Sequence, residues 1–94
     1  MAADFLTRRG ATIIGRNLRA GRGEIDILAR WGHTVVAVEV KTRRGGDPLL
    51  AFTPAKEQRV RAAMALVRPA PHRLDLVTVA VSASGVDIRW LPHI

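Results

Sequence analysis

The first half of the 94-residue chain shows short apolar and polar stretches that predict one helix followed by three strands. Residues 1–9 are typical of the end of an amphipathic helix, which Gly10 would stop as its C-terminal cap. The β-branched residues within 11–17 indicate a first strand. Glycines then break the chain, and two further strands are expected at 24–30 and from Thr34 to Lys41 or Thr42.

The second half predicts a helix between the third strand and two more strands. The turn-rich segment 43–48 forms a loop, and Thr53 suits the N-cap of a helix that runs to Arg68, just before Pro69. Residues 74–81 are almost continuously apolar, as in a strand covered on both faces, and 86–91 form the last strand. The apolar stripe of the helix comprises Val60, Ala63, Met64 and Val67.

The dipeptide Gly32-His33 suits a two-residue type II′ turn between the second and third strands. The resulting register places polar residues on one face, with Asp26 opposite Glu39 and Glu24 opposite Lys41. The other face is aliphatic, and its predicted pairs are Ile25 with Val40, Ile27 with Val38 and Ala29 with Val36. A slip of one residue would set Asp26 opposite a valine, so burial specifies the register.

Charge and composition narrow the function classes. The chain carries 15 Lys and Arg against 8 Asp and Glu, a net charge of +7, with most of the excess in residues 1–46. A folded basic surface attracts polyanions, and the few aromatic residues favour a phosphate backbone over unstacked bases as the target. The absence of Cys excludes a disulfide scaffold and a Cys-ligated zinc site. The absence of Cys also fits a reducing cytoplasm, so we expect a cytoplasmic protein. No apolar run approaches the ~18 residues of a membrane helix, so we expect no membrane span.

Asp26, Glu39 and Lys41 form the strongest candidate site. Opposed residues of an antiparallel pair have Cβ atoms about 4.5–5.5 Å apart, so the two carboxylates could share one divalent cation, with Lys41 near a bound phosphate. This chemistry cleaves phosphodiesters. Lys56 lies one turn before Val60 on the same stripe and should enter near the sheet. The cations expected to contact nucleic acid are Arg16, Arg19, Arg22, Arg43, Arg44 and Lys56.

A purely structural interpretation stays open for each of these residues. The acids and the lysine could form a charge cluster, Glu24 and Lys41 a cross-strand ion pair, and Lys56 a solvated helix lysine. Asp75 is expected to be bonded to a loop at a strand end, with Arg73 as a partner. The remaining expectations are a turn position for His33 and packing roles for Trp31 and Trp90.

Four ordered segments resemble the bacterial YraN family. They are Gly-Glu-Ile-Asp at 23–26, Val-Glu-Val-Lys-Thr-Arg at 38–43, Thr-Pro-Ala-Lys at 53–56 and Arg-Leu-Asp-Leu-Val at 73–77. That family is similar to the archaeal Holliday-junction resolvases, within the PD-(D/E)xK restriction-endonuclease-like superfamily. The acid and lysine spacing alone is a weak pattern, whereas the four segments in order are fairly specific.

The resemblance implies a single nuclease-like α/β domain over residues 1–94, with a restriction-endonuclease-like mixed β-sheet flanked by helices in the order α-β-β-β-α-β-β. It implies that Asp26 is the motif aspartate and that Glu39 and Lys41 are the (D/E)xK pair. The Val40 carbonyl would add a ligand to Mg²⁺ or Mn²⁺. DNA, including branched or structured DNA, is the implied substrate, and a homodimer is the implied assembly.

The first helix is expected to be truncated at its N-terminus. In relatives this helix is longer and carries a Gly-Glu pair just before the alanines that correspond to Ala2 and Ala3. Asp4 lies about five residues beyond that glutamate, roughly 140° around the helix axis. We therefore do not expect Asp4 to replace it.

Three functions follow from these observations. The first is a metal-dependent endonuclease, which predicts DNA nicking that Lys41→Ala abolishes. The second is a non-catalytic nucleic-acid-binding module on the same fold, which predicts salt-dependent DNA binding without a metal effect. The third is an assembly module whose arginines contact an acidic protein, which predicts no DNA binding at low salt.

Overall fold

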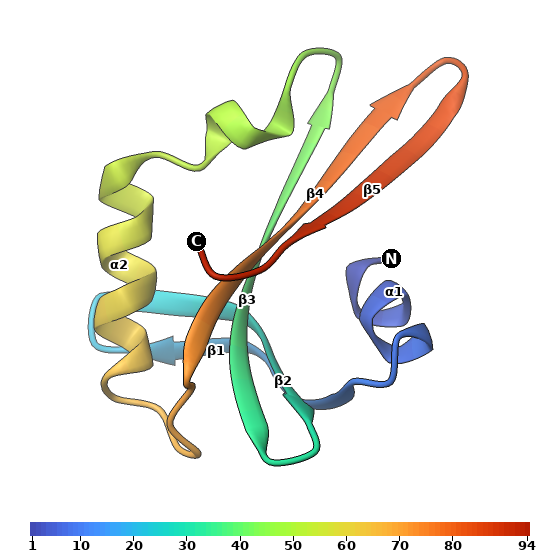
Figure 1. Cartoon of the computed structure of the whole chain (residues 1–94). Helices are drawn as coiled ribbons and strands as arrows, with labels where there is room; N and C mark the ends of the chain where they lie inside the picture. Colours follow the sequence, from blue (N-terminus) through green and yellow to red (C-terminus); the bar gives the residue numbers. More distant parts are fainter.

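Five strands join in one mixed sheet, and a helix packs on each of its faces (Figure 1). The computed structural model describes residues 1–94. In chain order its elements are α1 (Ala2–Arg8), β1 (Thr12–Ala20), β2 (Gly23–Trp31), β3 (Thr34–Arg44), the 3-10 helix η1 (Pro48–Ala51), α2 (Pro54–Met64), β4 (Arg73–Ser82) and β5 (Gly85–Leu91). The expected α/β class, with a mixed sheet flanked by helices, is confirmed. Neither helix has the length and apolar character needed to cross a membrane.

The strands lie in chain order, and only β3 and β4 are parallel. Because β3, α2 and β4 follow one another, α2 is the crossover between these parallel strands, as the sequence predicts. On one face, Leu6 of α1 packs with valines of β3 and β4, including Val38 and Val79. On the other face, Val60 and Ala63 of α2 pack with Ala37 and Leu74. Glu39 and Lys41 share the sheet face of Ala37, and therefore lie beneath α2.

The predicted hairpin register is confirmed between Ile27 and Trp31, which pair with Val38 through Thr34. Gly32 has φ +59°, the left-handed conformation that the first turn residue of a type II′ hairpin requires. The ladder ends at the Ile27–Val38 pair. The predicted pairing of Asp26 with Glu39 and of Glu24 with Lys41 is therefore not formed by the backbones.

Beyond this point the β1–β2 hairpin coils toward α2 (Figure 1). Ile25 packs with Val60 and Ala63 of α2, so the prediction that Ile25 shares one aliphatic face with Ile27 is wrong. The contact is close because Gly23 has no side chain. A Cβ at Gly23 would lie 2.1 Å from the carbonyl oxygen of Arg59. The glycine thus lets helix backbone and strand backbone meet.

Several elements differ in length from the prediction. β1 reaches Ala20 because its last residues pair with the start of β2, and β3 reaches Arg44 because it pairs with β4 as far as Val81. α2 ends at Met64 instead of Arg68. Its end is a tight turn, in which the N–H groups of Leu66 and Val67 both donate to the Ala63 carbonyl. Pro69 disfavours helical geometry only at Arg68, so it does not explain why the helix ends four residues earlier.

The start of α2 and the end of α1 follow the sequence signals. The Thr53 hydroxyl caps α2 by accepting from the N–H of Lys56 at 3.3 Å. Gly10 has φ +93° and ends α1, and the N–H of Ala11 reaches back to the Leu6 carbonyl at 3.1 Å. This arrangement is a Schellman cap, so the predicted stop at Gly10 is confirmed.

Candidate functional site

Asp26 on β2 lies where β2 and β3 separate. Its Oδ2 accepts a hydrogen bond of 2.8 Å from the N–H of Val40, the residue after Glu39. A side-chain carboxylate thus takes the place of a backbone carbonyl at the end of the ladder. This bond brings the Asp26 carboxyl to the Glu39–Val40 peptide and close to the Glu39 side chain.

Glu39 on β3 is a buried acid with only 6% of its surface exposed. Its Oε2 lies 3.1 Å from the Lys41 ammonium, whereas its buried Oε1 has no hydrogen-bond partner. Burial raises the pKa of Glu39 from 4.5 to about 7; the nearby Asp26 carboxyl adds to this rise, and Lys41 opposes it. The three predicted catalytic residues are therefore together, although not through the cross-strand pairing that the sequence suggested.

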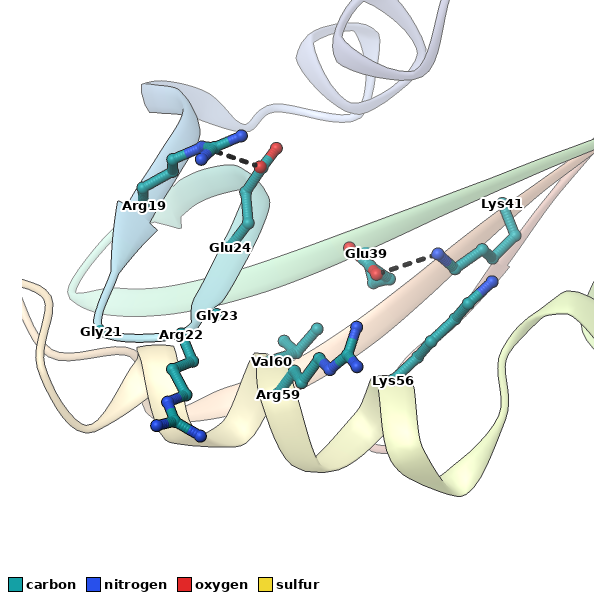
Figure 2. A pocket seen from close by; sticks show the side chains of 10 residues that line it. All are labelled: Arg19, Gly21, Arg22, Gly23, Glu24, Glu39, Lys41, Lys56, Arg59 and Val60. Carbon is teal, nitrogen blue, oxygen red and sulfur yellow. Dashed lines mark ion pairs between the residues drawn. The ribbon is translucent and has the colours of Figure 1, made fainter.

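A cavity of about 580 Å³ opens beside Glu39 and Lys41 (Figure 2). It lies between the β1–β2 hairpin, β3 and α2. Ten residues line it: Arg19, Gly21, Arg22, Gly23, Glu24, Glu39, Lys41, Lys56, Arg59 and Val60. Asp26 is not among them, so only one of the two site acids faces this space directly.

The six predicted nucleic-acid contacts divide into two groups. Arg19, Arg22 and Lys56 line the cavity. Arg16, Arg43 and Arg44 are exposed elsewhere on the strands. Lys56 is exposed as a residue, but its side chain enters the cavity toward Lys41 (Figure 2).

Sequence reasoning missed Arg59, which also lines the cavity. The available signal was its position three residues after Lys56, on the same side of α2. That spacing became informative only once the helix was known to lie over Glu39. Arg59 was otherwise one of several basic residues in the second half of the chain.

Other charged residues have structural roles. Glu24 pairs with Arg19 at 3.6 Å, so the suggested ion pair of Glu24 with Lys41 is wrong. Asp75 is fully buried within β4 rather than at a strand end. It accepts two hydrogen bonds from Arg73, as predicted, and one each from the Trp90 indole and the N–H of His93. A carboxylate with four donors is satisfied without any ligand.

The remaining aromatic and turn predictions are confirmed. Trp31 and Trp90 stack with ring centres 5.3 Å apart and an interplanar angle of 10°. His33 is exposed in the turn between β2 and β3. Asp4 is exposed in the first turn of α1, and α1 packs on the sheet face opposite α2. Asp4 therefore does not supply a third acid beside Glu39.

The carboxyls of Asp26 and Glu39 could hold a divalent cation. Hard cations such as Mg²⁺ prefer carboxylate and carbonyl oxygens, and a bound cation would offer the Oε1 atom of Glu39 the partner it lacks. No three His, Cys, Asp or Glu side chains gather around one point that could hold a metal. A cation here would therefore depend on two carboxylates, the Val40 carbonyl as a predicted ligand, and water.

The chain is similar to known proteins over most of its length. Residues 1–79 match the uncharacterised protein family UPF0102. A UPF0102 protein of Leifsonia xyli subsp. xyli is 50% identical over an alignment that covers 100% of this chain and 88% of the relative. Others from Symbiobacterium thermophilum and Roseiflexus castenholzii are 46% and 42% identical, covering 89% and 99% of this chain and 79% and 85% of the relatives. The chain therefore belongs to UPF0102, the YraN-like family that its four sequence segments suggested.

Proposed function

We propose that this protein is a metal-dependent endonuclease that hydrolyses phosphodiester bonds of DNA. The observation that carries the proposal is the state of Glu39: its Oε1 is buried without a hydrogen-bond partner, its Oε2 lies 3.1 Å from the Lys41 ammonium, and the residue lines a basic cavity. An acid in this state is costly for a fold that needs it only for packing. Its retention is explained if a cation and a phosphate complete the site.

The carboxyls of Asp26 and Glu39 repel each other when both are ionised, whereas both would attract a cation. Burial raises the pKa of Glu39 to about 7, and the Asp26 carboxyl adds to the rise because two neighbouring carboxyls cannot both ionise cheaply. Mg²⁺ or Mn²⁺ would displace the proton that Glu39 otherwise retains near neutral pH. When bound, the metal would lower the pKa of water and offset negative charge on the phosphate.

Lys41 supplies the positive group that acts on the substrate. Its ammonium is held 3.1 Å from Glu39 and is only 17% exposed, so it is positioned before a substrate arrives. During hydrolysis the attacking water would give a proton to solvent as its oxygen bonds to phosphorus, and the bond to the leaving oxygen would break as that oxygen takes up a proton from solvent. Negative charge would grow on the phosphate during this step. The Lys41 ammonium would donate hydrogen bonds to that charge, which is the largest effect available to an active site.

The proposals for the fold type, the form of the DNA substrate and the assembly rest on the four sequence segments that resemble the YraN family. By their resemblance, the fold is restriction-endonuclease-like, and the archaeal Holliday-junction resolvases are the similar enzymes. Branched or otherwise structured DNA is the form of substrate that this resemblance favours, and homodimerisation is the assembly it favours. The basic excess in residues 1–46 supports a nucleic-acid partner.

Incubating the purified protein with Mg²⁺ or Mn²⁺ and with linear, flap and four-way DNA tests the proposal. Nicking that requires metal and disappears in Glu39→Gln is expected. In parallel, Mn²⁺ titrated into the protein alone should bind wild type and fail to bind Glu39→Gln. Intact DNA under every condition, together with no Mn²⁺ uptake, would refute the endonuclease.

A non-catalytic nucleic-acid-binding module is the second candidate. The site offers a metal only two carboxylates, and no group of three metal-binding side chains is present. This small number of ligands favours a site that does not support catalysis. DNA binding that weakens steeply with salt and does not respond to Mn²⁺ would support this module over the enzyme.

A further inference from the structure

The cavity beside Glu39 contains more positive charge than its acids can neutralise. Five of its lining residues are cationic and two are acidic. Both acids are already paired within the cavity, Glu24 with Arg19 at 3.6 Å and Glu39 with Lys41 at 3.1 Å. The other three cations, Arg22, Lys56 and Arg59, make no ion pair and no side-chain hydrogen bond.

These three cations are held together by the fold. Arg22 is in the turn just before Gly23, and the absence of a side chain at Gly23 seats that turn directly against the Arg59 backbone. Lys56 and Arg59 are three residues apart on α2, which puts them on one side of the helix with a rise of about 4.5 Å between them. The packing therefore brings three unpaired positive charges to one cavity, and an anionic ligand would offset them.

The two kinds of cation lie at different sides of the cavity. In Figure 2 Arg22 and Arg59 lie on the side of the hairpin, with Arg22 pointing away from the other cations, and the ammonium groups of Lys41 and Lys56 lie together on the far side. Guanidinium groups bind phosphate in a two-pronged manner that an ammonium cannot match. The arginine end thus suits a phosphate that is held in place, whereas the lysine end lies at the proposed reaction site.

We infer that Arg59 is the main residue of a binding site for the phosphate that flanks the cleaved one on the same nucleic-acid strand, with Arg22 and Lys56 as the other unpaired cations of the cavity. The inference rests on the proposed function and extends it. The ligand is a polynucleotide strand with at least two consecutive phosphates, one at Lys41 and one at the arginines. Arg59 is the central residue of this flanking-phosphate site.

The test measures binding rather than cleavage. The anisotropy of a short fluorescent DNA duplex is recorded in EDTA at several salt concentrations, for wild type, Arg59→Gln and the control Arg8→Gln. Arg8 is an exposed, unpaired arginine of α1, which lies on the sheet face opposite the cavity. Both variants lose one positive charge, but only Arg59→Gln loses it from the cavity. Arg59→Gln should weaken binding about fivefold to tenfold and lower the salt slope by about one. Arg8→Gln should stay within about twofold of wild type.

Equal losses in the two variants, or an unchanged salt slope in Arg59→Gln, would overturn the flanking-phosphate site. Polyglutamate as a competitor separates nucleic acid from an acidic protein. If it displaces the duplex as effectively as unlabelled DNA does, the site does not recognise phosphate and the inference fails. Because no arm requires hydrolysis, a protein that binds in this way without cutting DNA would refute the endonuclease and still leave Arg59 as a phosphate-binding residue of the cavity.

Discussion

The Oδ2 atom of Asp26 accepts a 2.8 Å hydrogen bond from the N–H of Val40, and this bond sits where the β2–β3 ladder ends. Beyond this bond, toward Gly23, β2 coils toward α2, whereas β3 continues beside β4 toward Arg44. One side chain thus marks the point at which two strands part, and the space between them becomes the cavity. The same carboxyl contributes to the raised pKa of Glu39.

Replacing Asp26 separates its structural role from its charge. Asp26→Ala leaves the Val40 N–H without its acceptor and should lower the free energy of unfolding by about 1–3 kcal/mol. Asp26→Asn keeps an acceptor and should cost less. Urea denaturation of the metal-free variants measures both. Equal stability of wild type and Asp26→Ala would show that the hydrogen bond contributes nothing to the fold.

Glu39 should make the metal-free protein less stable as pH rises. Its pKa is about 7 when folded against 4.5 ordinarily, so the folded state favours the protonated acid. This contribution is fully present below about pH 4.5 and is lost as pH rises through 7, a change of about 2–3 kcal/mol. Glu39→Gln removes this pH dependence and should be the more stable protein at pH 8 in EDTA. Identical pH profiles of the two proteins would contradict the raised pKa.

Lys41→Ala should abolish cleavage while sparing the fold. Loss of a positioned cation that stabilises the transition state typically lowers kcat by about 10²–10³-fold. DNA binding in EDTA should fall far less, because Arg22, Lys56 and Arg59 remain. Single-turnover nicking measures the cleavage rate, and fluorescence anisotropy on the same preparation measures the DNA affinity. A parallel fall in binding and rate would assign Lys41 to ground-state binding instead.

Asp75 should prove structural and not part of the reaction. It is fully buried, pairs with Arg73 at 3.0 Å and accepts from Trp90 and His93. Asp75→Ala leaves Arg73 unpaired beside buried donors and should cost about 3–5 kcal/mol. Mn²⁺ affinity of the folded fraction should not change. Weaker Mn²⁺ binding without loss of stability would place Asp75 in the site.

Gly23 should tolerate no side chain. A Cβ there would lie 2.1 Å from the Arg59 carbonyl oxygen and 3.0 Å from the Ala63 Cβ, so Gly23→Ala must push α2 off β2 at a cost of about 3 kcal/mol. Gly32→Ala is the control, because Gly32 has open space around it and only a left-handed φ of +59°. The control should cost about 1–2 kcal/mol. Thermal unfolding compares them, and hydrogen exchange in α2 should rise only in Gly23→Ala.

The sequence by itself determined the features that depend on nearby residues. Gly32 and the alternation on either side of it fix the β2–β3 register, because a strand slipped by one residue would bury its acids. Thr53 and Gly10 fix helix ends through local hydrogen bonds. The two-residue spacing of Glu39 and Lys41 placed both on one face of β3, since residues two apart on a strand share a face. Asp26 joins them through its hydrogen bond with the N–H of Val40, which the predicted pairing did not foresee.

Only the tertiary structure decided what surrounds that site. Three features depend on contacts between elements that are distant in sequence. They are the end of the β2–β3 ladder at Asp26, the packing of Ile25 on α2 and the close approach of the Arg59 backbone to Gly23. The same holds for Glu39, whose pKa depends first on burial, and burial is a property of the packed molecule. Periodicity along a chain records which face a residue occupies, but the depth of that face and the charges across it are set only when the helix closes over the sheet.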